Sequence, residues 1–333
     1  MSAARSGSDL VGRSISVDVP ATTANLGAGF DALAMALDLA SLIRVEAIPH
    51  DVEPAILVEV HGEGAGHLPT GRRNRFVSAL LEGLAAGGLD ASDVGWRIYM
   101  DNTIPVARGL GSSASATVAA LVAADALLEH GLDRERILEL ATTAEGHADN
   151  AAAALYGGVC VVAEVDGRPR AIRLEPPDGL LAALYIPDRH LSTAAMRAAL
   201  PDSVPFADAV HNVGAASVAV AALTQGRLDL MAAATMDRRH EPYRADAYPE
   251  LPELVEGARA AGARGACLSG AGSTVVAFSD DPAAAATIAA AMERRAHELG
   301  LSGRASVQAA RGQGAVVIEE GDIRPDGSMP GLT

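Results

Sequence analysis

The loop at residues 109–115 carries the clearest chemical pattern in this sequence. It reads Gly-Leu-Gly-Ser-Ser-Ala-Ser, and an alanine-rich stretch with helical character follows it at 116–129. Small residues let the backbone approach a ligand closely, and consecutive N–H groups at a helix start can converge on an anion. The serine hydroxyls can donate to a phosphate or bind Mg²⁺. The alternative is a helix N-cap after a glycine turn, because serine is a favoured capping residue.

Four polar residues cluster further along the chain, at Glu145, His147, Asp149 and Asn150. His147 and Asp149 alternate and could ligate a metal, but one such pair is incomplete for zinc. Taken alone, the cluster is explained better by capping, with Asp149 or Asn150 at the start of a short alanine-rich helix.

Two further glycine loops carry polar side chains. Asn25 and Asp31 flank Leu-Gly-Ala-Gly-Phe, and the two glycines let this loop fold back and direct both side chains at one ligand. Turn formation is the competing explanation for such residues. The second loop, Ser-Gly-Ala-Gly-Ser-Thr at 269–274, is explained equally well as a hairpin turn. The charged stretch 237–244 is typical of a solvated helix end.

The basic residues exclude several kinds of enzyme. All 26 of them are arginine, so the chain has no lysine for a Walker-type phosphate loop, a Schiff base or a protein-kinase ion pair. The net charge of −16 argues against broad binding of duplex nucleic acid, which needs a basic face. It does not argue against an anionic ligand, because a local site can be positive inside a negative protein.

Length and composition indicate a globular protein of about two domains. The chain has 333 residues, of which 49% are hydrophobic and 3% aromatic, so its core must consist mainly of alanine, valine and leucine. Cys160 and Cys267 lie far apart in apolar runs, which predicts two buried thiols in a reducing compartment. Residues 1–10 lack the apolar run of a secretory signal, and the longest apolar stretch, 151–163, is too short to span a bilayer. We therefore expect a cytoplasmic protein.

The elements that must position these residues do not alternate strictly between strand and helix. Hydrophobic periodicity predicts strands at 14–19, 42–48, 55–60, 94–101, 157–164, 181–186, 266–268, 274–278 and 315–318. It predicts helices at 73–86, 116–129, 134–144, 193–200, 207–223, 228–238, 254–261 and 282–299. This order favours an α+β fold over a doubly wound parallel sheet. A turn-rich stretch at 166–177 is the predicted linker, which gives domains at 1–165 and 166–333.

Four stretches occur in a defined order. They read Val-Pro-Ala-Thr-Thr-Ala-Asn-Leu-Gly-Ala-Gly-Phe-Asp at 19–31, Pro-Val-Ala-Arg-Gly-Leu-Gly-Ser-Ser-Ala at 105–114, Glu-Gly-His-Ala-Asp-Asn at 145–150 and Leu-Ser-Gly-Ala-Gly-Ser-Thr at 268–274. Together they resemble the GHMP kinase superfamily and, within it, the homoserine kinase family. One departure is Ser273, where the family usually has proline, and it bears on the stiffness of that loop.

The resemblance implies a GHMP kinase fold, with an N-terminal ATP-binding domain like the second domain of ribosomal protein S5 and a ferredoxin-like C-terminal domain. It implies ATP- and Mg²⁺-dependent phosphorylation of the side-chain hydroxyl of L-homoserine in threonine biosynthesis, by direct transfer without a covalent intermediate. It also implies a homodimer, with no nucleic-acid or membrane partner. A related kinase for mevalonate-type acids or sugars, or a non-enzymatic nucleotide-binding relative, is the alternative.

The resemblance also assigns residues to roles. It places the nucleotide on Asn74, Pro105, Arg108, Gly109, Leu110, Gly111, Ser112, Ser113, Ala114 and Ser115, with Asn74 at the adenine. It places Mg²⁺ on Ser113 and Glu145, and the amino-acid substrate on Asn25, Asp31, His147, Asp149, Asn150, Arg197 and Arg244. The two arginines would hold the substrate carboxylate. The catalytic group would comprise Asn150, Asp149 and Glu145, with Asp149 as the one nearby carboxylate that could act as a base.

Overall fold

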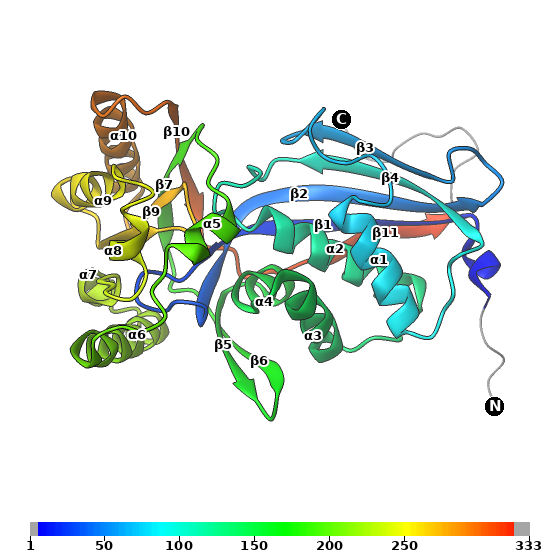
Figure 1. Cartoon of the computed structure of the whole chain (residues 1–333), viewed down its shortest axis with the longest axis horizontal. Coiled ribbons are helices and arrows are strands. Elements are labelled where there is room, and N and C mark those ends of the chain that lie inside the picture. Colours follow the sequence, from blue (N-terminus) through cyan, green and yellow to red (C-terminus); the bar gives the residue numbers. More distant parts are fainter. Residues whose placement is uncertain (1–5, 323–333) are drawn as a thin grey trace.

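The computed structural model describes residues 6–322 and consists of two antiparallel-rich sheets with their covering helices, which confirms the predicted α+β class (Figure 1). Residues 1–5 and 323–333, which contain the ends of both predicted domains and the start of the segment analysed for a secretory signal, lie outside the described residues.

The first sheet has seven strands, and it contains the first and the last strand of the described chain. Its strands are β1 (Arg13–Ala24), β2 (Leu33–Pro49), β3 (Ile56–Gly62), β4 (Val94–Asn102), β5 (Val159–Val165), β6 (Arg168–Leu174) and β11 (Val316–Asp322). The order is β11-β1-β2-β4-β3, and β5 pairs with both β2 and β6. Only the β3–β4 pair is parallel among these described strands.

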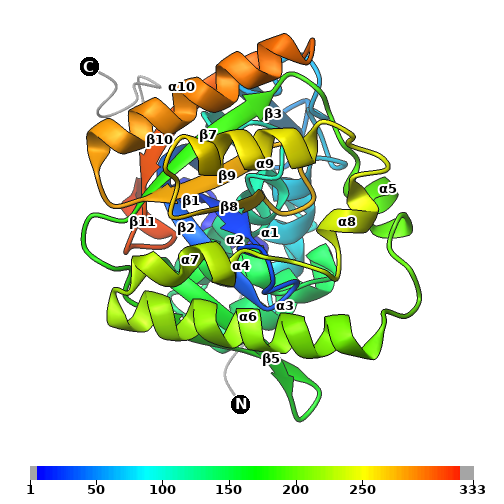
Figure 2. The same ribbon diagram turned by 90° about the vertical axis from the view of Figure 1, so that its left-hand side faces the viewer.

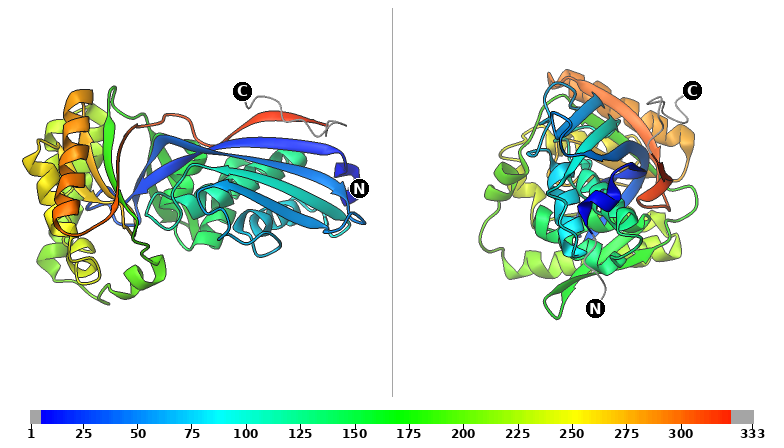
Figure 3. Two further views of the ribbon diagram at one scale, coloured as in Figure 1. Left: turned by 90° about the horizontal axis from the view of Figure 1, so that it is seen from above. Right: turned by 90° about the vertical axis from the view of Figure 1, so that its right-hand side faces the viewer.

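Four helices cover one face of this sheet (Figures 1 and 3). They are α1 (Arg75–Ala86), α2 (Ser112–Leu127), α3 (Arg134–Glu145) and α4 (Asp149–Tyr156). The alanine-rich helix α2 is buried on most of its surface, because it packs against β1 beneath it and against α1, α3 and α4 beside it. Small side chains allow this close packing on several sides at once.

The second sheet has four antiparallel strands in the order β10-β7-β9-β8. They are β7 (Leu181–Pro187), β8 (Gly265–Leu268), β9 (Val275–Ser279) and β10 (Gly303–Ala309). One face packs against α9 (Leu251–Ala260) and α10 (Pro282–Glu298), as Figure 2 shows. The other face packs against α6 (Phe206–Gln225), α7 (Met231–Ala234) and residues of the first sheet, so both sheets share one core cluster.

Short helical segments complete the described chain. They are α5 (Thr193–Ala198), α8 (Glu241–Arg244) and two 3₁₀ turns, Gly7–Leu10 and Leu228–Leu230. Local signals explain several boundaries. The side chains of Asn74, Asp133 and Asp281 accept the N-terminal backbone N–H bonds of α1, α3 and α10, and Gly146 ends α3 in the left-handed conformation.

The predicted linker at 166–177 is wrong, because residues 168–174 form β6, the partner of β5 in a hairpin. This strand contains three arginines and a proline and has no buried residue, so its pairing rests on backbone hydrogen bonds that hydrophobic periodicity does not reveal. The last strand, β11, returns to pair with β1 in the first sheet. The division into sheets therefore does not follow one boundary in the sequence at 165/166.

One described helix, α6, is long and apolar enough to cross a membrane by length and composition. It packs on the shared core through Ala219, Ala222 and Leu223. A single helix of this kind is weak evidence for a membrane span. The two cysteines are buried and free, as predicted.

Candidate active site

A cavity of about 380 Å³ is lined by residues from the first sheet and its helices and from α5, α8 and the turn at 270–271. Its wall combines residues of β1 and β2 and the end of β4 with the start of α2, the link between α3 and α4, and residues of α5, α8 and the 270–271 turn. The site residues expected from the resemblance all line it except Pro105. These positions span residues 25–244 of the chain, so it is the fold that brings them to one cavity.

The glycine loop delivers backbone donors to this cavity. Gly111 is the N-cap of α2 with φ +72°, and no side chain caps the helix, so the serine-cap explanation does not hold. The first N–H groups of a helix have no partner within the helix and attract anions. A Cβ at Gly109 would overlap the carbonyl oxygen of Ser269, so the backbone of the second glycine loop packs directly against this one.

Not every serine of the loop faces a ligand. The Ser115 hydroxyl is buried and donates to the carbonyl of Pro20 at 2.7 Å, which attaches α2 to β1. The Ser113 hydroxyl instead donates to Glu145 Oε1 at 3.1 Å. Two of the serines in one short motif therefore have different tasks, and their spacing alone does not separate them.

Glu145 lies at the end of α3 with a side chain only 7% exposed. Its Oε1 accepts hydrogen bonds from Ser113 and from the Thr117 hydroxyl at 2.7 Å, and it forms an ion pair with Arg75 Nε at 3.3 Å. The sequence analysis did not single out Thr117 or Arg75. Their distance from Glu145 in sequence hides the contact, although Thr117 does follow Ser113 by one helical turn.

This donor set fits Mg²⁺, which binds oxygen and is commonly held by one or two carboxylates plus phosphates and water. A hydroxyl and a single carboxylate face the cavity beside the helix start. Within residues 6–322, no group of three or more histidine, cysteine, aspartate or glutamate side chains could form a metal site of its own. A metal here would therefore depend on the nucleotide for further ligands.

His147, Asp149 and Asn150 form a connected set at the start of α4. His147 Nδ1 donates to Asp149 Oδ1 at 2.6 Å, and this bond raises the pKa of the buried imidazole. The same oxygen accepts the Asn150 backbone N–H at 2.7 Å. The Thr22 hydroxyl donates to Asn150 Oδ1 at 2.7 Å, so Thr22 is a further residue that orients this set.

The loop between β1 and β2 holds Asn25 and Asp31 in the left-handed region, with φ of 71° and 56°. Asn25 is buried and binds protein on both sides: its Nδ2 donates to Gly270 O, and its Oδ1 accepts the Asp31 N–H. Asp31 faces Arg197 of α5 in a bidentate ion pair. The structure therefore shows Asn25 as the residue that shapes the loop and Asp31 as the charge it presents.

Arg244 lies in the same region but is 2% exposed. Its Nε donates to Met196 O and its Nη1 to Gly270 O, and burial lowers the pKa of the guanidinium. Within residues 6–322, no carboxylate lies within ion-pair distance of it. A buried cation without an anionic partner is unfavourable, unless a ligand supplies the anion.

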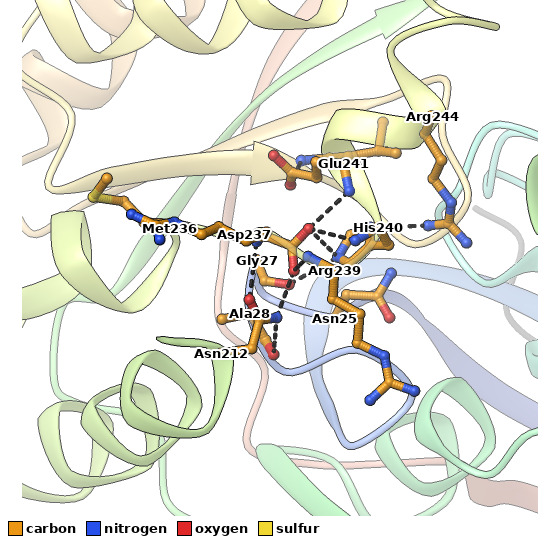
Figure 4. A network of polar contacts seen from close by, with 12 residues as sticks. Asn25, Gly27, Ala28, Asn212, Met236, Asp237, Arg239, His240, Glu241 and Arg244 are labelled. Atoms are coloured by element: carbon orange, nitrogen blue, oxygen red, sulfur yellow. Dashed lines mark hydrogen bonds and ion pairs between the residues drawn. The ribbon is translucent and has the colours of Figure 1, made fainter. Parts of the chain in front are cut away.

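A polar network that the sequence did not reveal positions Arg244 (Figure 4). His240 is fully buried, and its Nδ1 lies 3.2 Å from Arg244 Nη1, which can only donate. His240 Nδ1 is therefore the acceptor, and its Nε2 carries the proton that is donated to Gly27 O at 2.9 Å. Burial also lowers the pKa of His240 to about 4, which keeps it neutral.

Asp237 holds this network in place by hydrogen bonds. Its carboxylate accepts the backbone N–H groups of Arg239, His240 and Glu241, and it accepts Asn212 Nδ2 at 2.7 Å. Asn212 Oδ1 in turn accepts the Arg238 N–H. The stretch 237–244 is therefore not simply a solvated helix end, because the side chains of Asp237, His240 and Arg244 are turned inward and hold α8 (Figure 4).

Two expected nucleotide residues are already engaged with protein. Asn74 is 2% exposed; its Oδ1 accepts the Phe76 N–H and its Nδ2 donates to Pro69 O. Arg108 donates to the carbonyls of Val106, Pro187 and Asp188. Both side chains line the cavity, so contact with a nucleotide stays a prediction for each.

The second glycine loop connects β8 to β9 and packs on the first glycine loop at 109–115. The Ser269 hydroxyl donates to Gly109 O at 2.7 Å, and the Thr274 N–H donates to Arg108 O at 3.0 Å. Ser273, at the position where the family usually has proline, donates its hydroxyl to Arg189 O at 2.5 Å. The loop is thus a hairpin connection and also a wall of the site.

The chain is similar to known kinases over most of its length. Residues 74–158 match the model "GHMP kinases N terminal domain" and residues 219–298 match "GHMP kinases C terminal". The chain is 42% identical over 279 residues to homoserine kinase of Corynebacterium glutamicum (strain R), covering 82% of this chain and 88% of the relative. It is 42% identical over 281 residues to that of Moorella thermoacetica, covering 84% and 93%.

Solved structures agree with this similarity. The crystal structure of homoserine kinase from Cytophaga hutchinsonii matches with a TM-score of 0.80 and 29% identity, covering 92% of this chain and 97% of that one. The mevalonate kinase of L. major matches with a TM-score of 0.62 at 18% identity, covering 91% and 96%, which shows a common fold alone.

Proposed function

The chain belongs to the homoserine kinase family of the GHMP kinases, and we propose that it transfers the γ-phosphoryl group of ATP to the side-chain hydroxyl of L-homoserine. The products are O-phospho-L-homoserine, a precursor in threonine biosynthesis, and ADP. The observation that supports this most strongly is the buried Arg244, whose charge faces the cavity without a carboxylate partner within residues 6–322.

The charges at this end of the cavity fit a small zwitterion. Arg244 and Arg197 supply guanidinium groups for a carboxylate, because the fork of arginine binds a carboxylate with two hydrogen bonds. Asp31 supplies a carboxylate for an ammonium group, and Asp149, which also lines the cavity, supplies a second one. A substrate with both groups satisfies all of these charges at once.

The other end of the cavity fits the phosphates of ATP. The N-terminus of α2 offers backbone N–H groups and the positive end of the helix, and Gly109 and Gly111 leave room for close approach. Ser113 and Glu145 would hold Mg²⁺, which neutralises charge on the phosphates when it is bound. Asn74 and Arg108 stay proposed nucleotide contacts at the rim.

Phosphoryl transfer needs positioning and charge neutralisation more than covalent chemistry. Asn150 lies between Thr22 and Asp149, where its Nδ2 can orient the attacking hydroxyl. Asp149 Oδ1 is saturated by His147 and Asn150, so Oδ2 is the atom that can accept a proton or bind the ammonium group. We propose direct transfer, with Asp149 in one of these two roles.

An ADP-release assay with several acceptors tests this function. Homoserine should give turnover well above serine, threonine, mevalonate and galactose, because mevalonate and sugars leave Asp31 without an ammonium partner. A site built for a buried polar partner rejects analogues that lack it by up to ~10⁴-fold. Turnover with mevalonate or galactose above that with homoserine would assign the chain to a different GHMP kinase.

We also propose that the protein is a cytoplasmic homodimer, in line with the resemblance to the family. Sedimentation equilibrium of the full chain tests the dimer, and a monomer mass at micromolar concentration contradicts it.

A further inference from the structure

Arg75 contacts both groups that would hold the metal. It lies in the first turn of α1, and its Nε donates to Ser113 Oγ at 3.3 Å and lies 3.3 Å from Glu145 Oε1. Its side chain is 45% exposed, whereas that of Glu145 is 7% exposed. In this structure the half-exposed guanidinium of Arg75 therefore neutralises the nearly buried carboxylate of Glu145 beside the glycine loop at 109–115.

The other arginines that line the cavity are committed elsewhere or lie apart from this point. Arg108 donates to three carbonyls, Arg197 pairs with Asp31, and Arg244 donates to Met196 O and Gly270 O. In the described part of the chain, Arg73 lines the cavity without contacting Ser113 or Glu145. Because the chain has no lysine, arginine is the strongly basic side chain that it can offer to the phosphates.

The chemistry of the site favours a change of partner. A nucleotide phosphate chain at the start of α2 would lie next to Ser113, within reach of the Arg75 guanidinium on its long stem. Phosphate oxygens match the planar fork of arginine, and such charge-assisted bonds are stronger than neutral ones. A divalent cation at Glu145 and Ser113 would repel Arg75 from that carboxylate and towards the anion beside it.

We propose that Arg75 is a phosphate ligand of the bound nucleotide, and that without nucleotide it occupies the metal position by pairing with Glu145 and Ser113. The inference rests on the proposed kinase function for the identity of the nucleotide. It gives this residue a binding role that neither the motifs nor the family models assign.

Calorimetric titration of ATP and ADP in the presence of EDTA tests the proposal without any metal or turnover. Arg75→Leu should weaken ATP binding at least about tenfold, because a charge-assisted contact is lost, and Arg75→Lys should recover part of the affinity. Arg136→Leu is the matched control. Arg136 also lies in a first helical turn, is 49% exposed and pairs with a glutamate, Glu139, but lies outside the cavity.

Equal ATP affinity of Arg75→Leu and the wild-type protein in EDTA overturns the proposal, and so does an equal loss in Arg136→Leu. Arg75→Leu should fold normally, because leucine is a good helix former and the Arg75 side chain is 45% exposed. Glu145 keeps its hydrogen bonds from Ser113 and Thr117 in this variant. The homoserine assay separates the two proposals. Turnover of homoserine with an unchanged EDTA affinity removes Arg75 alone, whereas Arg75-dependent ATP binding without homoserine turnover removes the proposed substrate and keeps the phosphate ligand.

Discussion

Arg197 and Asp31 form a bidentate ion pair across the mouth of the substrate end, with Nη1–Oδ2 at 2.9 Å and Nη2–Oδ1 at 2.7 Å. The pair joins α5 to the loop between β1 and β2, and both residues line the cavity. A zwitterionic substrate can replace this ion pair by two others, in which its carboxylate binds Arg197 and its ammonium group binds Asp31. In this structure the two charges proposed to engage the substrate therefore neutralise each other.

We predict that Asp31→Asn and Arg197→Leu each raise the KM for homoserine at least about tenfold, because each removes a charge-assisted partner of the substrate. The free energy of unfolding should change by less than about 1 kcal/mol, since both side chains are about one-third exposed and solvent screens the pair. Steady-state kinetics and urea unfolding measure these effects. An unchanged KM in both variants would show that the Arg197–Asp31 pair only joins α5 to the loop between β1 and β2 and does not bind the substrate.

Arg244→Leu should lower kcat/KM for homoserine by an amount equivalent to a loss of at least about 2 kcal/mol of transition-state stabilisation, because the substrate carboxylate loses a desolvated partner. The affinity for ATP should change little. Arg239→Leu is the control. The guanidinium of Arg239 also lies over the Phe30 ring, at 5.2 Å against 5.3 Å for Arg244, but its side chain is exposed. Parallel loss of ATP binding in Arg244→Leu would indicate misfolding or a nucleotide role.

Glu145→Gln should leave the fold intact and lower kcat about 100-fold or more, because the amide is a poor Mg²⁺ ligand. The Mg²⁺ concentration needed for half-maximal activity should rise at the same time. Glu139→Gln, earlier on α3 and paired with Arg136, serves as the control. Near-normal kcat of Glu145→Gln at saturating Mg²⁺ is the result that contradicts the metal role.

Gly111→Val should lower the stability of the folded protein. The sequence alone instead predicts an effect on nucleotide binding. The sequence suggests that a side chain here fills the space of the phosphates, but a Cβ at Gly111 would overlap Thr22 Oγ1. The positive φ adds about 1 kcal/mol of strain for any residue with a Cβ. Thermal melting should show a lower Tm for Gly111→Ala, and Thr22→Ala should restore part of it. No restoration would mean that strain alone is responsible.

Glu241 should make a contribution to stability that falls as the pH rises from 4.5 towards about 8. The Oε1 atom of this carboxyl group accepts the Leu268 N–H of β8 at 2.8 Å, and burial raises its pKa from 4.5 to about 8. Between these values the folded protein keeps a proton that the unfolded chain has released, so raising the pH favours unfolding. Glu241→Gln should lose less Tm over this window than the wild type, with Glu256→Gln, exposed on α9, as the control. Identical pH profiles would contradict the shift.

Local chemistry was available from the sequence alone. The run Gly109–Ser115 followed by a helical stretch predicts a phosphate-binding helix start, since both the glycine conformations and the helix signal are local properties. Most helices and strands also follow from hydrophobic periodicity, as the agreement at α10 and β4 shows. The motif order pointed to the family, which the relatives at about 40% identity confirm.

Contacts between distant residues needed the tertiary structure. The pairing of β11 with β1 depends on backbone hydrogen bonds between segments about 300 residues apart, so no local pattern contains it. The same holds for Arg75 with Glu145, for Thr22 with Asn150 and for His240 with Gly27. Each side chain has an ordinary polar identity in the sequence. Its role comes from the burial and the partner that packing of the two sheets imposes, because both depend on the whole chain.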